Sequence, residues 1–431
     1  MKVYERIYEY YLDEMRQGRL KQGDRMPSLR ECEATLGFSR TSVETAYMML
    51  AADGYIYSQE KIGFYVTDMM EKIGGDSGKS EAADNSIKAA KCAIKYDFAT
   101  IKEDRDASCL DLWRRYMKSA LRAEDRLLSY ALNQGEEDLR EEIAAYVRHA
   151  RNIICTKDDI VIGAGFQNLL HILIPLIEGD KTVSFPTKDF IDGSKAFADA
   201  GFDVSYRNKD CHVLYVTPAY MTKWGEVMTM RRRHEITEHA REHNHLIIED
   251  DYQNEFVFGS QPTPSLYAMN GGENVAYLGS FSRILLPSIR ISFLILPKGY
   301  KERYTGVMRY YNQTAAKAEQ IALAQFLRDG HMRRHIKKIR RIYSEKRELM
   351  ISALERYLKN DTRLLLGDSG MEIGLVVEKE DIADKLADKG IAITVVRKEN
   401  YEVTLLLSCS GVENELIEPG IRLLNEIIEE I

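Results

Sequence analysis

The N-terminal part of the chain carries a helical pattern of apolar residues, followed by a strand-like one. Apolar positions between residues 4 and 17 fall on one face of a helix. Ser28 is placed to cap a second helix, and Ser39 a third helix that follows after a short turn. Two short runs, "YIYSQ" and "GFYVT", then alternate like strands. This order predicts a helix-turn-helix followed by a two-stranded wing.

From residue 93 onward, short apolar runs alternate with amphipathic segments. Runs such as "DIVIGA", "TVSFP" and "LIIEDDY" read as buried strands, and segments with helical periodicity separate them. Strands separated by helices favour a mostly parallel sheet that is covered on both faces. We therefore expect an α/β body whose ligand-binding residues lie at the carboxyl ends of its strands.

One segment, residues 69–92, lacks such a pattern. It is rich in Gly, Ser, Asp and Lys and poor in large apolar residues, so it cannot bury enough surface to balance the entropy cost of ordering. We expect a head at 1–68, a flexible linker at 69–92 and a body at 93–431, with a small subdomain at about 325–431.

Composition excludes several classes of protein. No apolar run reaches the roughly 20 residues that span a bilayer, and the charged N-terminus has no signal-peptide core, so we expect a cytoplasmic protein without a membrane partner. The six cysteines are far apart and form no CxxC, which favours neither a zinc site nor a disulfide framework. His239 and His243 share a helix face, but a solvated polar face explains them better than a metal site.

The net charge of −7 gives no general affinity for nucleic acid, so any DNA contact must come from a local patch. The head has slightly more acidic than basic residues. Several basic residues nevertheless occur in or beside its predicted turns, where they can steer and contact phosphate. These are Arg16, Arg19, Lys21, Arg25, Arg30 and Arg40.

The segment "GDRMPSLRECEATLGFSRTSVETAYMMLAADGYI" resembles the winged helix-turn-helix of the GntR family of bacterial regulators. The resemblance implies that Arg30 grips phosphate and that the third helix enters the major groove of operator DNA. Ser39, Arg40 and Thr41 would lie at its leading end. Arginine suits guanine, and a serine with free amides at a helix start suits phosphate.

The wing departs from the family pattern. The usual Gly-Ser-Gly-Thr-like tip is replaced by "EKIGFYV", which keeps Gly63 and places Lys61 before it. Lys61 and Gly63 are still candidates for contact with DNA. The alternative interpretation of the head is that Arg30 and Arg40 are ordinary surface charges.

The body resembles the fold type I aminotransferases, which depend on pyridoxal phosphate and have a large α/β domain and a small C-terminal α+β domain. Together with the head, it resembles the MocR subgroup of GntR regulators. "NQGEEDLREEIAAYVRHARNI" is similar to the dimer-contact segment, with Gly135 at the matching glycine. The resemblance implies a homodimer, and a two-fold dimer suits paired DNA half-sites.

The same resemblance implies a pocket for the cofactor or another anionic effector. Asp250 would hold the ring nitrogen, Tyr252 the ring oxygen O3′, and Phe190 would stack on the ring. Amides at a helix start and a cation would hold the phosphate. The phosphate residues would be Gly165, Phe166, Gln167, Ser280, Ser282 and Arg290.

The catalytic position of that pocket holds the wrong residue. In "YLGSFSRILLPSIRISF" Arg283 stands where the family has the lysine that bonds to the cofactor. A guanidinium stays protonated and delocalised, so it has no lone pair for that bond. The resemblance therefore implies no catalytic residue here, and pyridoxal phosphate, if it binds, would bind without a covalent link.

Other departures point the same way. After "VTP" the family has a histidine or asparagine and a Pro-Thr-Gly turn, whereas this chain has Tyr220 and keeps only Gly225. The arginine that clamps a substrate carboxylate is replaced by Leu406. Lys188 or Lys223 is an alternative source of an amine, although neither is at the end of the expected strand.

The sequence predicts a dimeric DNA-binding transcriptional regulator whose body has lost transamination and senses a small anionic effector. Three states of the pocket are open: empty or self-filled, with Arg283 reaching Asp250 and filling the cleft; occupied by another anion; or occupied by non-covalent pyridoxal phosphate. Two other function classes remain: a transaminase that carries a DNA-binding head, and a DNA-bound scaffold without a ligand.

Overall fold

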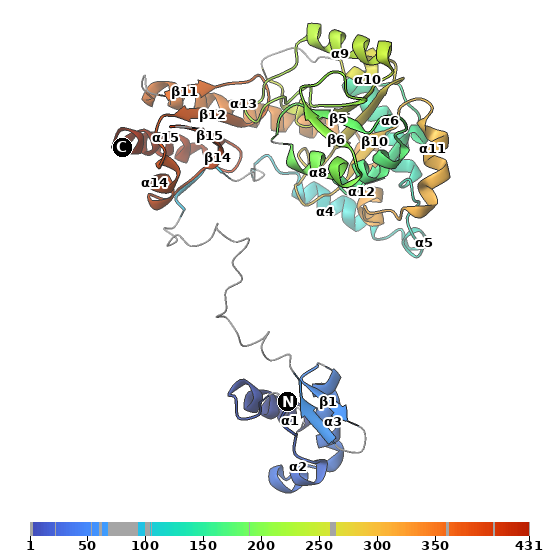
Figure 1. The fold of residues 1–431 in the computed structure, drawn as a ribbon, viewed down its shortest axis with the longest axis vertical. Helices are drawn as coiled ribbons and strands as arrows, with labels where there is room; N and C mark the ends of the chain where they lie inside the picture. Colours follow the sequence, from blue (N-terminus) through green and yellow to red (C-terminus); the bar gives the residue numbers. More distant parts are fainter. Residues whose placement is uncertain are drawn as a thin grey trace. The chain divides into compact units, whose positions relative to one another are not determined.

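The computed structural model describes residues 3–21, 23–52, 54–59, 63–67, 94–99, 104, 106–188, 190–258, 264–358, 362–399 and 401–430. The chain forms two compact units, Met1–Lys88 and Ala89–Ile431, which Figure 1 shows as a ribbon. The boundary between them falls inside the predicted linker, residues 69–92, which lies outside the described part of the chain. No helix among the described residues is long and apolar enough to cross a membrane.

The first unit has the predicted helix-turn-helix and wing. Its three helices precede an antiparallel pair of strands in which Ile56 lies opposite Val66. The elements are α1 (Val3–Arg16), α2 (Leu29–Leu36), α3 (Arg40–Ala52), β1 (Ile56–Gln59) and β2 (Gly63–Val66).

Local signals in the sequence explain where α2 begins and ends. The Ser28 hydroxyl accepts from the amide of Glu31, and the Glu31 carboxylate accepts from the amide of Ser28, which completes a capping box. Gly37 ends the helix in the left-handed region, with φ 70°, which costs glycine little. The helix is therefore defined by residues within its own segment.

The core of the first unit is built on tyrosines. Tyr47 is fully buried between Tyr11 and Phe64, with ring centroids 5.4 Å from each, and its hydroxyl donates to the carbonyl of Pro27 at 2.9 Å. Tyr11 in turn donates to the sulfur of Cys32 at 3.2 Å. These contacts join α1, α2, α3 and the wing into one core.

The second unit contains a seven-stranded sheet in the order β4-β10-β9-β8-β7-β5-β6. Neighbouring strands are parallel except on both sides of β10, which runs antiparallel to β4 and β9. The predicted mostly parallel sheet is thus confirmed. Its strands are β4 (Ile160–Gly163), β5 (Thr182–Phe185), β6 (Asp203–Tyr206), β7 (Val213–Val216), β8 (Leu246–Asp250), β9 (Val275–Ser280) and β10 (Ser292–Ile295).

Helices cover both faces of this sheet, as Figure 1 shows. Apolar residues of α7 (Phe166–Leu173), α8 (Ile191–Asp199) and α11 (Tyr300–Val307) pack on one face. The other face packs against α6 (Glu137–Arg151), α9 (Met230–His243), α10 (Leu266–Met269) and α12 (Lys317–Arg328). The remaining helices of this part are α4 (Leu110–Ala120), α5 (Glu124–Leu127) and the 3₁₀ turns Lys157–Asp159, Ile174–Leu176, Asn254–Phe256 and Met308–Tyr310.

The C-terminal part forms a smaller layer, coloured orange to red in Figure 1. Its four-stranded antiparallel sheet has the order β11-β12-β15-β14, and β3 pairs in parallel with β13. The strands are β3 (Tyr96–Asp97), β11 (Thr362–Leu365), β12 (Glu372–Val377), β13 (Ile391–Ala392), β14 (Thr394–Glu399) and β15 (Glu402–Ser408). The helices are α13 (His331–Tyr357), α14 (Ile382–Asp388) and α15 (Asn414–Glu430).

Candidate ligand pocket and DNA interface

Predicted pocket residues lie at one edge of the large sheet. Asp250 is the last residue of β8 and Ser280 the last of β9, and α7 begins at Phe166 just after β4. Because β4, β8 and β9 run in the same direction, their carboxyl ends meet at this edge. The topology therefore brings the predicted ring-binding acid and the predicted phosphate-binding helix start together.

The start of α7 and Arg290 form the cationic part of the pocket. Gly165 precedes the helix with φ 95°, and no side chain caps α7. A Cβ on Gly165 would lie 2.5 Å from Nη2 of Arg290, so the guanidinium lies directly against the glycine backbone. Phe166 is half-buried and Gln167 is exposed. Free amides and an adjacent guanidinium are groups that bind a phosphate or a carboxylate.

The two serines of the predicted cup bond to nearby groups. The Ser280 hydroxyl accepts from the amide of Ser282 at 3.3 Å and lies 3.0 Å from the hydroxyl of Ser292, which donates to it. The Ser282 hydroxyl donates to the carbonyl of Ile289. These bonds hold the turn between β9 and β10 in shape, and a ligand would have to share the two hydroxyls with them.

Asp250 accepts a hydrogen bond from Tyr215, 35 residues earlier on β7, at 2.6 Å. Burial raises the pKa of Asp250 to about 6, with a smaller contribution from the charge of Asp251, while the bond from Tyr215 acts in the opposite direction. The ring of Phe190 lies 6.2 Å from that of Tyr215 at 54°. Asp250, Tyr215 and Phe190 thus form one group, in which Tyr215 was not predicted.

Arg283 is buried, with 8 % of its side chain exposed, and its Nη2 donates to Oε1 of Glu372 at 3.0 Å. The same nitrogen lies 3.9 Å from Sδ of Met371. A guanidinium placed here needs a carboxylate partner. Glu372, at the start of β12, supplies it, whereas the self-filled alternative predicted Asp250 in that role.

Further polar groups surround Glu372, which is 2 % exposed. Its Oε2 accepts from the amide of Met371 at 3.0 Å, from the hydroxyl of Tyr220 at 3.3 Å and from Nε2 of Gln253 at 3.4 Å. Oε1 of Gln253 is buried without a hydrogen-bond partner among the described residues. Sequence reasoning missed Glu372 and Gln253; the available signal was an acidic residue that opens an otherwise apolar strand, "EIGLVV".

Two tyrosines complete this side of the pocket. The rings of Tyr220 and Tyr252 meet edge to face, with centroids 5.7 Å apart. Burial, and then the charge of Glu372, raise the pKa of Tyr220, so it is a neutral hydrogen-bond donor. Tyr252 is 36 % exposed and therefore accessible to a ligand. Leu406 lies in β15 opposite Gly374.

The predicted alternative amines lie elsewhere. Lys188 is exposed after the end of β5, and the half-buried Lys223 offers its carbonyl to the hydroxyl of Tyr220. Of the histidines, His239 and His243 stack at 4.2 Å, and both have ring centroids 5.5 Å from His245. Within the described residues, no group of three or more metal-binding side chains is arranged to hold a metal ion.

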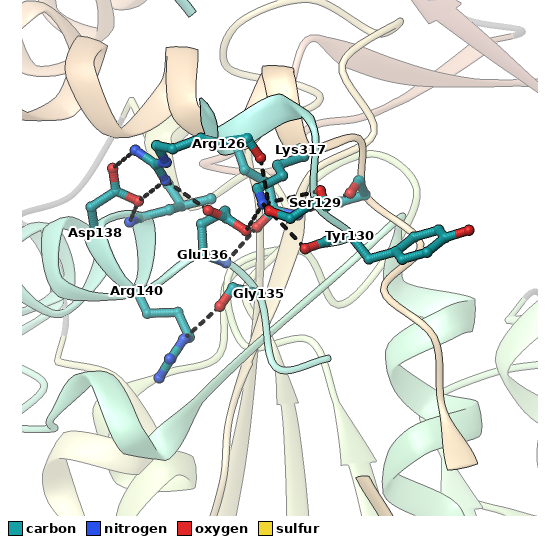
Figure 2. A network of polar contacts seen from close by, with 11 residues as sticks. Arg126, Ser129, Tyr130, Gly135, Glu136, Asp138, Arg140 and Lys317 are labelled. Carbon is teal, nitrogen blue, oxygen red and sulfur yellow. Dashed lines mark hydrogen bonds and ion pairs between the residues drawn. The ribbon is translucent and has the colours of Figure 1, made fainter. Parts of the chain in front are cut away.

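Charged residues hold the start of the predicted dimer-contact segment, residues 133–153, and the loop just before it (Figure 2). Nζ of Lys317 donates to the hydroxyl and carbonyl of Ser129 at 2.9 and 3.2 Å and to the carbonyl of Tyr130 at 3.1 Å. Arg126 bonds to Glu136 and Asp138 at 2.7 to 3.0 Å. The ring of Tyr130 points away from this network and is fully exposed.

Gly135 lies near the start of the predicted dimer-contact segment and cannot be replaced easily. It has φ 103°, and a Cβ would lie 2.4 Å from Cγ1 of Ile162. The close approach of the segment to β4 therefore needs a residue without a side chain.

The predicted DNA-contact residues are exposed in the first unit. Arg30 lies in α2, Arg40 and Thr41 begin α3, and Ser39 precedes α3 with its hydroxyl 3.0 Å from that of Ser42. The side chains of Arg30 and Arg40 are both exposed to solvent. Arg19 pairs with Glu14 at 2.6 Å.

Of the two wing residues that are candidates for DNA contact, the structure describes one, Gly63. Gly63 opens β2 with φ 137°, and the side chain of Arg25 lies beside it, with Nε 3.4 Å from the position of a Cβ. Lys61 lies outside the described residues.

Two family profiles match the chain, one within each of its compact units. The profile of bacterial regulatory proteins of the gntR family matches residues 3–66. The profile of aminotransferase class I and II matches residues 207–424.

Among solved structures, an archaeal alanine:glyoxylate aminotransferase matches with a TM-score of 0.69 and 21 % identity, covering 78 % of this chain and 91 % of that one. A kynurenine aminotransferase of Pyrococcus horikoshii matches with a TM-score of 0.68 and 22 % identity, over 79 % and 92 % of the two chains. These similarities establish a fold type I aminotransferase-like body.

Curated relatives match over almost the whole chain. The HTH-type transcriptional regulators YhdI and YdeL of Bacillus subtilis are each 30 % identical over 97 % of this chain, and over 94 % and 95 % of their own. The probable rhizopine catabolism regulatory protein MocR of Rhizobium meliloti is 24 % identical over 86 % of this chain and 81 % of its own. The chain therefore belongs to the GntR family of bacterial transcriptional regulators, in the MocR-type group that joins a helix-turn-helix domain to an aminotransferase-like body.

Proposed function

We propose that this regulator binds operator DNA as a homodimer and senses a small anionic effector in a body that performs no transamination. The observation that carries the proposal is the buried ion pair between Arg283 and Glu372. This pair supports the proposal because, by the resemblance to aminotransferases, Arg283 matches the position of the reactive lysine, and a guanidinium held by a carboxylate cannot form the covalent bond.

The remaining pocket residues fit parts of pyridoxal phosphate. Gly165, the free start of α7 and Arg290 suit its phosphate, and Asp250 suits a protonated ring nitrogen. When bound in an enzyme, this cofactor serves as an electron sink during amino-group transfer. Arg283 offers no nucleophilic nitrogen for the cofactor's aldehyde, so this chain would hold the molecule only by non-covalent contacts.

The ion pair also limits what else the pocket accepts. Removing one partner of a buried pair typically costs about 3–5 kcal/mol, so Arg283 stays on Glu372 unless a ligand provides an equivalent anion. An effector would therefore bind Arg290 and the start of α7 with its anionic group. It would meet Tyr252, the more exposed of the two tyrosines, with its remaining part.

Exposed apolar residues support the homodimer. Leu121, Leu128, Tyr130 and Leu132 are 59 %, 87 %, 100 % and 52 % exposed within one stretch of the chain. Such a group of large apolar side chains usually marks a protein interface. The loop that carries Tyr130 is held in place by Lys317, so its shape is prepared before a partner binds.

The mechanism we propose is a population shift. An effector that binds one conformation of the body more tightly raises the fraction of that conformation, and DNA affinity changes by the same coupling energy. The two DNA-binding heads of a dimer would respond together, since paired half-sites require a set spacing.

The direct test uses full-length protein and a DNA duplex selected from a random pool by its binding to that protein. The duplex is titrated alone and with pyridoxal phosphate, pyridoxal, inorganic phosphate or short dicarboxylates. We expect at least one anion to change the apparent Kd several-fold, and the variant Arg290→Gln to lose that change. If every anion leaves the Kd unaltered, effector sensing is rejected.

A parallel assay tests the absence of transamination. The protein is mixed with pyridoxal phosphate and a panel of amino acids and keto acids, and keto-acid formation is followed. We expect no turnover above that of free cofactor. Turnover at an ordinary enzymatic rate would support the transaminase alternative instead.

A further inference from the structure

A second cavity, of about 370 Å³, lies at the ends of β5, β6 and β7 and beside the first turns of α9. Asp250, Gly165 and Arg290 are not part of its lining. Leu214 and Val216 line it and pack in the core on the α9 side of the sheet. Tyr215, the residue between them, also belongs to the lining, although its side chain packs in the core on the opposite side and donates to Asp250. The side chains of β7 thus alternate between the two faces of the sheet, and Tyr215 links this cavity to the group around Asp250.

The inner part of this cavity is apolar. Besides the two residues of β7, Met221, Met228 and Ile236 contribute to its lining. Met228 is 6 % exposed, and Met221 and Ile236 are partly buried against the same core. An apolar floor of this kind binds a hydrocarbon or aromatic group by removing it from water.

The rim of the cavity is cationic. Arg207, Lys209 and Arg232 line it together with one carboxylate, that of Glu226. Arg207 has φ 53°, and its Nε donates to the carbonyl of Pro186 at 3.2 Å, which fixes its side chain. Arg232 shares Glu235 with its neighbour, at 3.2 Å, and remains 56 % exposed.

One buried polar group in the lining lacks a partner. Thr217, just after β7, is 1 % exposed, and its hydroxyl forms no hydrogen bond with any described residue. Buried hydroxyls are normally satisfied, and an exception points to a missing partner. A polar atom of a ligand in this cavity would be such a partner.

We propose that this cavity is a second ligand site, which takes a small carboxylate with an apolar body, such as an aryl alkanoate. The apolar floor would bury the body and the cationic rim would bind the carboxylate. A phosphorylated sugar or a dicarboxylate fits this lining less well, since either would leave a polar group on the apolar floor. The inference does not depend on the function proposed for the pocket around Asp250.

The test measures binding of 3-phenylpropanoate to the full-length protein by calorimetry, with its neutral amide as a comparison. We expect saturable binding of the carboxylate and at least tenfold weaker binding of the amide. Trp224 provides a second readout, because it lies between Met221 and Glu226 of the lining. Its fluorescence should change with the same Kd.

Variants locate the site. The double variant Lys209→Gln, Arg232→Gln should weaken binding at least tenfold, and Thr217→Val should weaken it several-fold. Arg231→Gln is the matched control, because Arg231 also pairs with Glu235 but is not part of the lining, and it should change the Kd less than twofold. Arg232 and Lys209 are exposed, so their replacement should leave folding intact.

Two results would overturn the proposal. One is the absence of saturable binding of the carboxylate at millimolar concentration. The other is binding that survives the double variant and disappears in Arg290→Gln, because the probe would then occupy the pocket around Asp250. Loss of binding in the double variant with retention in Arg290→Gln supports the second site and leaves the proposed effector pocket untouched.

Discussion

At the scale of single residues, the chemistry of the candidate pocket depends on Arg283 and the carboxylate that holds it. The guanidinium lies between the turn after β9 and the start of β12, and its partner is 89 residues away in the sequence. A lysine at the same position would be an amine that titrates and reacts, whereas arginine stays charged. The identity of residue 283 therefore decides whether this pocket could form a covalent bond to the cofactor.

The variant Arg283→Lys should restore a covalent link to pyridoxal phosphate if the remainder of the pocket still fits the cofactor. We expect new absorbance near the visible edge and cofactor that stays attached after borohydride reduction and denaturation. The wild type and Arg283→Gln serve as controls and should show neither. Covalent attachment in the wild type would point to another lysine and contradict our assignment.

We expect that removing one partner of the Arg283–Glu372 ion pair destabilises the fold more than replacing both partners with apolar residues. Glu372→Gln leaves a buried guanidinium without its anion, and we expect a loss of about 3–5 kcal/mol in the free energy of unfolding. The double variant Arg283→Met, Glu372→Leu should lose less than Glu372→Gln alone. Urea unfolding checks both. Equal losses from the single and double variants would show that the two side chains are not coupled.

Asp250 should give the stability a defined pH dependence. Its pKa in the folded protein, about 6, is higher than the ordinary 3.8, so the folded state binds more protons between these values. The free energy of unfolding then falls as pH rises from about 4 to about 6. The side chain of the Asp250→Asn variant cannot titrate. As pH rises across this range, the free energy of unfolding of the variant should therefore increase relative to that of the wild type by up to about 3 kcal/mol.

Unfolding curves at a series of pH values check this prediction. The substitution Asp250→Asn also alters the hydrogen bond from Tyr215, but the effect of that bond on stability does not vary over this pH range. A difference between variant and wild type that is constant from pH 4 to pH 6 would mean that Asp250 does not have a raised pKa.

At the scale of elements, α2 and α7 begin in opposite ways. The capping box of Ser28 and Glu31 satisfies amides at the start of α2. In α7 no side chain caps the helix, because Gly165 precedes it, and the guanidinium of Arg290 lies beside that glycine. The first arrangement is built for stability, whereas the second leaves donors for an anion.

Ser28→Ala should therefore weaken the head. Loss of the cap typically costs about 1 kcal/mol, and the effect should appear as faster amide exchange in α1 to α3 and weaker DNA binding. Ser58→Ala, on exposed β1, is the control and should change neither. Unchanged exchange in α2 after Ser28→Ala would show that the box does not limit the stability of the head.

At the scale of the whole molecule, the chain has two compact units, to which we assign DNA binding and, as a proposal, ligand binding. The first unit keeps its cationic side chains at the surface, and the second collects its candidate ligand groups at sheet edges. A homodimer would bring two of each together, and the exposed stretch from Leu121 to Leu132 is our candidate for its contact.

Leu128→Asp should separate the dimer. Leu128 is 87 % exposed in the isolated chain, so the change should not affect folding, but a buried carboxylate in an interface would lack a partner. We expect a shift to monomer in sedimentation experiments and at least tenfold weaker binding to a two-half-site duplex. Tyr401→Asp, at a residue 76 % exposed, is the control. A variant that remains dimeric places the contact elsewhere.

The sequence by itself determined the features that are encoded over a few neighbouring residues. Apolar periodicity and the cap at Ser28 predicted the helix-turn-helix, and strand runs ending at Asp250 and Ser280 predicted an α/β body with a ligand edge. These signals are local, because a cap, a turn or an amphipathic face depends on residues within one or two helical turns.

Only the tertiary structure decided which distant groups meet. The bond between Tyr215 and Asp250 follows from the order of β7 and β8 in the sheet, and the pairing of Arg283 with Glu372 from the packing of two layers. The second cavity depends likewise on how α9 covers the ends of three strands. Contacts of this kind are set by strand order and packing, which no short stretch of sequence encodes.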